Sequence, residues 1–147
     1  MKKYIYICFA LAMFLFASAE SSYACSCLAS PAPVKEQIQG AFSSADAVFS
    51  GEVVEIIESP ADKDTLIVKF KIAKSWKGKA QPEVTIKTAK ESAMCGYSFT
   101  TGQKYIVYAY GAGDALSTDN CSRTAMLGKK NDAKYLDKLK RKVKRSK

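Results

Sequence analysis

The sequence contains no histidine, so the chain lacks the side chain that most often serves as general acid–base catalyst and metal ligand. It also lacks a G-x-S-x-G motif, a phosphate-binding glycine loop and a metalloprotease H-E-x-x-H motif. The closest paired carboxylates, Glu55 with Glu58 and Asp62 with Asp64, fall at a predicted strand end and in a predicted turn. Solvated surface is the expected role of such residues. The chain is therefore predicted to be a binding protein without a cofactor, not an enzyme.

Long apolar runs are scarce as well. The only one, from Ile5 to Phe16, follows Lys2 and Lys3 and is too short to span a bilayer. This pattern predicts that residues 1–24 are a secretory signal peptide and that the chain has no transmembrane segment. The protein is expected to be secreted, and the periplasm and the cell surface remain open as final locations.

The cleavage site determines which residue begins the mature chain. Cleavage after Ala24 makes Cys25 the first residue, whereas cleavage after Ala19 leaves Glu20 first. Lipid attachment to Cys25 is disfavoured, because Ser22 occupies the position where an aliphatic residue is needed.

Removal of the signal peptide removes Cys8 and leaves four cysteines, an even number that favours two disulfides in an oxidising compartment. A bond between Cys25 and Cys27 would close a strained ring, so each is expected to bond to Cys95 or Cys121. Both crossed pairings remain open at this point, and each bond is expected to contribute about 4 kcal/mol to stability. A four-cysteine zinc site is the disfavoured alternative, because the two later cysteines are isolated residues and no histidine is available.

Charge is distributed unevenly along the chain. Residues 25–128, the predicted single domain, contain eleven basic and eleven acidic residues, whereas residues 129–147 contain ten basic and two acidic ones. This basic C-terminal helix or tail includes a run from Lys138 to Lys147 that is suited to contact an anionic surface. The alternative is a solvated end. Nucleic acid is not an expected partner, because the protein is exported and no aromatic residues interrupt the run.

Hydrophobic periodicity indicates a mainly β fold with a short helix on the N-terminal side and a C-terminal helix. β-Branched and alternating segments predict strands at residues 47–57, 66–72, 84–88, 104–110 and, most briefly, 116–118. Apolar residues at helical spacing predict helices over residues 34–45 and 132–143. Residues 25–33 contain two prolines and are expected to be extended. Five short strands in a domain of this size favour a small closed or partly open barrel.

Several sequence features, taken together, carry a family resemblance. They are Cys25-Ser26-Cys27 at the predicted mature start, the segment GAFSSADAV at residues 40–48, Cys95-Gly96-Tyr97, and Cys121. The combination resembles the N-terminal netrin-like domain of the tissue inhibitors of metalloproteinases, in a bacterial-type single-domain form. The resemblance implies a five-stranded barrel of the oligonucleotide/oligosaccharide-binding (OB) type and covers nearly all of residues 25–123.

The resemblance also implies a pairing, a partner and a site. Cys25 bonds Cys95, and Cys27 bonds Cys121. The amino nitrogen and carbonyl oxygen of Cys25 chelate the catalytic zinc of a target metalloendopeptidase. The wedge that fills the substrate cleft comprises Ser26, Cys27, Leu28, Ala29, Ser30, Ala93, Met94 and Cys95.

The chain departs from the family pattern in two respects. The family's third disulfide is missing, and Ser43 stands where its first cysteine would be. The second domain of the animal proteins is also missing, and the basic end occupies its place. The alternative function is therefore a netrin-like surface or adhesion module that uses the barrel and the basic tail without inhibiting a protease.

Overall fold

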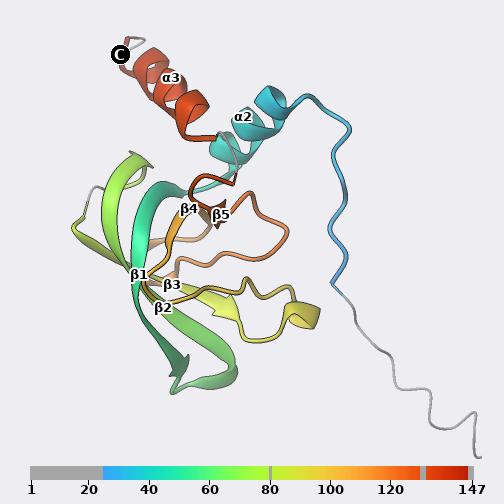
Figure 1. Ribbon diagram of the computed structural model, residues 1–147, viewed down its shortest axis with the longest axis vertical. Coiled ribbons are helices and arrows are strands. Elements are labelled where there is room, and N and C mark those ends of the chain that lie inside the picture. Colours follow the sequence, from blue (N-terminus) through green and yellow to red (C-terminus); the bar gives the residue numbers. More distant parts are fainter. Residues whose placement is uncertain (1–24, 80, 130–131, 146–147) are drawn as a thin grey trace, which may run out of the picture.

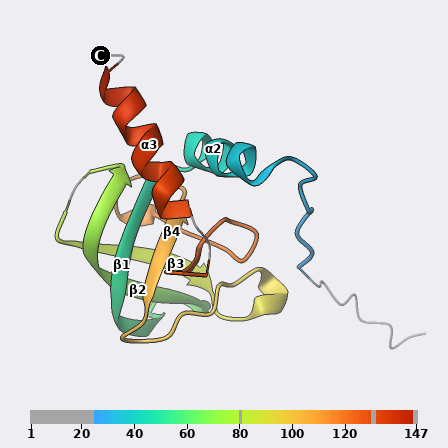
Figure 2. The same ribbon diagram turned by 45° about the horizontal axis from the view of Figure 1, so that its top comes forward.

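The computed structural model describes residues 25–79, 81–129 and 132–145. The predicted signal peptide and the last two positions of the basic run lie outside these ranges. The described chain forms one antiparallel sheet of five strands in the order β3-β2-β1-β4-β5, with helices α2 and α3 at one end of it (Figures 1 and 2). The predicted mainly β fold with five strands and two helices is confirmed. Within the described ranges, no helix combines the length and apolar character that crossing a bilayer requires.

Most helices and strands in the structure are longer than the segments predicted for them. The elements are α2 (Val34–Ser44), β1 (Ala47–Ser59), β2 (Asp62–Lys77), β3 (Glu83–Ala89), η1 (Ser92–Met94), β4 (Lys104–Ala109), η2 (Gly113–Ala115), β5 (Ala125–Met126) and α3 (Asp132–Arg145). β1 and β2 are longer than predicted, so only Pro60 and Ala61 remain between them. Trp76, which lies beyond the predicted strand at residues 66–72, is inside β2. That strand ends at Lys77, before Gly78 adopts the left-handed φ of 88°.

The predicted fifth strand at residues 116–118 is wrong. In the structure Ser117 forms two isolated bridges, one parallel to Lys87 of β3 and one antiparallel to Tyr110 just after β4. The fifth strand is instead β5, which pairs with β4. A two-residue strand is too short to produce a periodic pattern, so the sequence carried no signal for it. The bridges at Ser117 link β3 to the end of β4.

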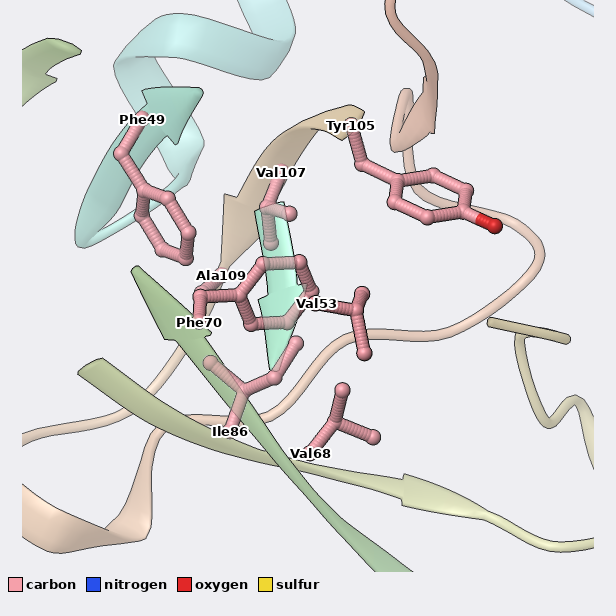
Figure 3. Close-up of a cluster of buried hydrophobic side chains, with 8 residues drawn as sticks. All are labelled: Phe49, Val53, Val68, Phe70, Ile86, Tyr105, Val107 and Ala109. Carbon is pink, nitrogen blue, oxygen red and sulfur yellow. The ribbon is translucent and has the colours of Figure 1, made fainter. Parts of the chain in front are cut away.

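One hydrophobic cluster fills the concave side of the sheet. Its buried members come from all four long strands, as Figure 3 shows: Phe49, Val53, Val68, Phe70, Ile86, Tyr105, Val107 and Ala109. The Phe70 ring meets Phe49 and Phe99 edge-on, with centroid distances of 5.5 and 5.3 Å. Burial of each large side chain contributes roughly 1.5–3 kcal/mol, so this cluster is the main source of stability for the sheet.

A second cluster joins the opposite face of the sheet to both helices. Ile38 from α2 and Leu136 from α3 are fully buried against Val48, Trp76 and Tyr108. The start of the basic C-terminal region is therefore packed into the protein body through Leu136.

Asp137 connects α3 to the sheet and provides a pH-dependent contact. Its Oδ1 atom forms an ion pair with Lys74 and accepts a hydrogen bond from Trp76 Nε1, both at 2.6 Å. The bond from Lys74, followed by that from Trp76, lowers the pKa of Asp137 below its ordinary value. Because the folded-state pKa is depressed, this contribution to stability is present above the unfolded-state pKa and is lost as the pH falls through the folded-state pKa.

We therefore expect acid titration to change the fluorescence of Trp76, the only tryptophan, with a midpoint below the ordinary aspartate value of about 3.9. Asp137→Asn should remove this step, because the carboxylate is then absent at every pH. A midpoint at or above the ordinary value, or an unchanged titration in the variant, would contradict the assignment.

Candidate functional site

Two disulfides bring four cysteines into one cluster. Cys25 bonds Cys95 and Cys27 bonds Cys121, with Cα–Cα distances of 5.1 and 5.2 Å. The two bridges contact each other, because Cys25 Sγ lies 3.7 Å from Cys121 Sγ. The sulfurs of Cys25, Cys27 and Cys121 all lie within 4.8 Å of one another. In the disulfide form they are not thiolates and are not suited to ligate zinc, so this cysteine cluster acts as a covalent junction.

The junction places the start of the predicted mature chain beside η1. The backbone nitrogen of Cys25 donates a hydrogen bond to the carbonyl oxygen of Ala93 at 3.1 Å. Ser26, Ala93 and Met94 are exposed around this contact, and Met94 exposes 45% of its surface. The segment at Cys25 and Ser26 and the segment at Ala93 and Met94, about 70 residues apart in the sequence, thus lie side by side at one exposed edge.

The backbone around Cys95 is tightly constrained. Cys95 has the left-handed φ of 66°, which is uncommon for a residue with a side chain, and its nitrogen donates to the carbonyl of Ser92 at 3.0 Å. Gly96 is buried, and a Cβ atom there would overlap the carbonyl oxygens of Ala89 and Glu91. The glycine in Cys95-Gly96 is therefore required by the close approach of two backbone segments.

Asn120 is a site residue that the sequence reasoning missed. Its backbone nitrogen donates to the Cys95 carbonyl at 2.9 Å, and its Nδ2 atom donates to the Ser92 carbonyl at 3.3 Å. Its Oδ1 atom lies 3.4 Å from Cys25 Sγ and 3.5 Å from Cys121 Sγ. These two are contacts and not hydrogen bonds, because disulfide sulfurs carry no hydrogen. Asn120 thus joins η1 to the cysteine cluster, and only its place beside Cys121 could have suggested this.

Buried hydroxyl groups fix the loop that carries Asn120 and Cys121. Thr118 Oγ1 donates to the carbonyl of Tyr108 at 2.9 Å and lies 2.8 Å from Thr124 Oγ1. The backbone nitrogen of Tyr108 donates to Thr124 Oγ1 at 3.0 Å. Because buried polar groups are stable only when hydrogen-bonded, these threonines hold both ends of the loop on β4.

Residues 28–33 form an extended strap that leads from the cysteine cluster to α2 (blue in Figure 1). Leu28 is fully exposed, and Ala29 and Ser30 are exposed beside it. Near its other end, Gln37 Nε2 of α2 donates to the carbonyl oxygens of Ala32 at 2.7 Å and Ser30 at 3.2 Å. The strap is therefore attached at Cys27 by a disulfide and near Ala32 by a side-chain amide.

A buried ion pair lies behind Gln37. Arg123 Nη1 donates to Gln37 Oε1 at 2.9 Å, while Arg123 Nε and Nη2 each donate to one carboxylate oxygen of Asp132 at 2.9 Å. The Asp132 side chain is 2% exposed and also accepts a hydrogen bond from the Tyr108 hydroxyl at 3.0 Å. Burial, followed by the Asp132 charge, raises the pKa of Tyr108, and the bonds to Asp132 raise that of Arg123. Tyr108 therefore stays a donor and Arg123 stays a cation.

A surface cavity of about 470 Å³ lies at a different place, and none of the predicted site residues lines it. Its apolar lining includes Phe49, Ile72 and Leu116. Two of its polar lining groups already have partners within the protein: Lys77 Nζ donates to carbonyls at the end of α2, and Asp46 accepts the Gly111 N–H. The cysteine cluster with its exposed edge is therefore the better candidate site.

The structure separates the predicted wedge into two parts. Cys25, Cys27, Ala93 and Cys95 meet at the cysteine cluster, and Ser26 and Met94 are exposed beside them. The remaining wedge residues continue along the strap: Leu28, Ala29 and Ser30. Neither a scan against protein-family models nor a search of curated proteins finds a match to this chain.

Proposed function

We propose that the mature chain is a secreted inhibitor of zinc metalloendopeptidases, related to the netrin-like domain of the tissue inhibitors of metalloproteinases. The observation that carries the proposal is the cysteine cluster, which holds Cys25 against Ala93 at an exposed edge. Disulfides that only stabilised the fold would not need to hold the first residues of the mature chain at an exposed edge. Nor would they need to place those residues beside the exposed Ala93 and Met94. The chain acts by binding and needs no cofactor of its own.

We further propose that the sheet is a partly open barrel of the OB type. The two bridges at Ser117 support this, because they connect β3 to the end of β4 across the opening of the sheet. The hydrogen bonds from Lys87 N to Leu116 O and from Thr118 N to Lys87 O, at 2.8 and 2.9 Å, strengthen that connection. A closed or nearly closed sheet would hold the cysteine cluster on a rigid rim.

The inhibitory step uses the free amino end that cleavage after Ala24 creates. The amino nitrogen and carbonyl oxygen of Cys25 chelate the target's zinc and replace the water that would attack the substrate. An α-amine has a pKa near 8, and coordination to zinc favours the deprotonated form. The contact with Ala93 O uses one hydrogen of the nitrogen, so a neutral amine keeps its lone pair for the metal.

The exposed residues beside Cys25 supply the contacts with the substrate cleft. Ser26 lies at the mouth of the target's main specificity pocket in this proposal, while Leu28 and Met94 offer apolar surface. The disulfides fix these residues before binding, so less conformational entropy is lost when the complex forms.

The test uses oxidised mature protein that begins at Cys25, with its first residue verified by N-terminal sequencing. It is assayed against a panel of zinc metalloendopeptidases, with serine and cysteine peptidases as controls. We expect active-site-directed inhibition within the zinc panel alone. Absence of inhibition across a broad zinc panel, or equal inhibition of the serine peptidases, would oppose the proposal.

A second candidate function, contact with an anionic surface, is supported by α3. Lys134, Lys138 and Arg141 are exposed at spacings of four and three residues, which places them on one side of the helix. Leu136 is buried on the protein body, so the helix holds these charges in a fixed arrangement. We call these three residues the basic stripe. They extend the predicted basic run, which starts at Lys138, toward the beginning of the helix.

Reversal of the basic stripe to glutamate should weaken binding to anionic phospholipid vesicles roughly 100-fold, since each basic residue near such a surface contributes about 1 kcal/mol. Co-sedimentation measures this, with neutral vesicles as the blank. The control is a triple reversal of the exposed sheet residues Lys63, Lys71 and Lys87, which changes the net charge equally. Equal losses in both variants would show that net charge alone matters and would exclude a dedicated surface.

A further inference from the structure

We infer that Gln37, Arg123 and Asp132 form a positioning relay that holds the exposed strap, residues 28–33, in its binding geometry. The inference rests on the proposed function in one respect, namely that the strap contacts the target. The positioning itself follows from contacts within this chain, and it involves residues outside both the cysteine cluster and the predicted wedge.

Gln37 uses both ends of its side-chain amide. Its Nε2 atom faces the carbonyl oxygens of Ser30 and Ala32, and its Oε1 atom faces the guanidinium of Arg123. The opposite orientation would put donor against donor and acceptor against acceptor, so the surroundings allow one orientation only. Gln37 therefore links the strap backbone to Arg123, so the position of Arg123 determines where the strap backbone is held.

Arg123 is itself immobilised by two hydrogen bonds to the buried Asp132 carboxylate, which also binds Tyr108 of β4. Paired hydrogen bonds between a guanidinium and a carboxylate fix orientation as well as distance. The relay thus runs from the central sheet through α3 and Arg123 to α2 and the strap.

Both attachments of the strap lead to the same short loop. Cys27 forms a disulfide with Cys121, and Gln37 accepts a hydrogen bond from Arg123, which lies two positions after Cys121 in the sequence. Strap and loop therefore form a closed frame with a covalent side and a hydrogen-bonded side. Leu28 is fully exposed, so no neighbouring side chain fixes its position. The attachments at the two ends of the strap therefore determine where the Leu28 side chain is presented.

Loss of the hydrogen-bonded side should let the strap sample many conformations. Fixing the backbone of one residue costs about 1–2 kcal/mol, so re-ordering even one strap residue on binding would weaken affinity roughly tenfold. The relay is therefore expected to change affinity through pre-organisation, without contacting the target.

Two substitutions separate positioning from stability. Gln37→Met removes both ends of the amide. Gln37→Glu keeps an acceptor for Arg123 but cannot donate to the strap carbonyls. We expect both variants to raise backbone mobility at residues 28–30 in ¹⁵N relaxation, with order parameters falling from about 0.85 toward 0.6. Inhibition should weaken roughly tenfold in both, while Gln37→Glu keeps wild-type thermal stability because its charge pairs with Arg123.

Gln39→Met is the matched control, because Gln39 is exposed on the same helix. It should leave mobility and inhibition unchanged. A wild-type relaxation profile for residues 28–30 in Gln37→Glu would overturn the relay. Should the wild-type protein inhibit no zinc peptidase, the proposed function fails, and the relaxation comparison still decides whether the relay positions the strap.

Discussion

A single alanine added before Cys25 of the mature protein is expected to weaken inhibition of a sensitive zinc metalloendopeptidase roughly 100-fold or more, equivalent to about 3 kcal/mol of binding free energy. The added residue converts the amine of Cys25 into an amide, whose nitrogen lone pair is delocalised into the carbonyl and does not ligate zinc. It also places an extra residue where the metal would lie. The fold should be unaffected, because the Cys25 nitrogen can still donate to Ala93 in the amide form.

Inhibition constants for the two proteins, measured with the same target, provide the comparison. A version with one alanine after Lys147 controls for the added residue, and matched thermal unfolding with complete loss of free thiols shows that the fold is intact. Undiminished inhibition by the N-terminally extended protein would eliminate zinc chelation as the mechanism.

Asp132→Ala is expected to lower the free energy of unfolding by about 3–5 kcal/mol, the usual cost of removing one partner of a buried ion pair. The Asp132 side chain is 2% exposed, and its loss leaves the Arg123 charge and the Tyr108 hydroxyl without their buried acceptor. Denaturant unfolding of the oxidised protein measures the change.

Two further variants test this explanation. Glu83→Ala removes the partner of Lys69 in an ion pair whose side chains are 42% and 52% exposed, and it should cost at most about 1 kcal/mol. Adding Arg123→Met to Asp132→Ala should recover part of the loss, because the unpaired buried charge is then gone. Additive effects of the two substitutions would show that their ion pair is not the source of the stability.

The local pattern of the sequence was sufficient to predict most elements of the fold. β-Branched residues and alternation located the four long strands, and apolar spacing located both helices, because these signals lie within a single element. The failures occurred where a longer-range contact decides the structure. Ser117 joins two strands by single bridges, and Trp76 lies in β2, where it is buried in the same hydrophobic cluster as Leu136 and Ile38.

The residues of the candidate site also divide into those that local sequence features predict and those that depend on long-range contacts. Cysteines are recognisable in any sequence, so their convergence could be anticipated. Gln37 and Arg123 are 86 residues apart, and Asn120 acts through its contacts with remote backbone groups. A single sequence carries no signal for such side-chain contacts, because ordinary polar residues at these positions would fit a solvated surface equally well.

The span of the two disulfides has a consequence for biosynthesis. Their partners are 70 and 94 residues apart, and the earlier cysteine of each pair belongs to Cys25-Ser26-Cys27. In the export that we propose, the N-terminus leaves first, so these two thiols would meet the oxidant outside the cytoplasm long before Cys95 and Cys121 arrive. An oxidase that joined cysteines in order of emergence would trap the small Cys25–Cys27 ring. Under that proposal, correct maturation would require either that the sheet assembles before oxidation is complete or that an isomerase reopens the early product.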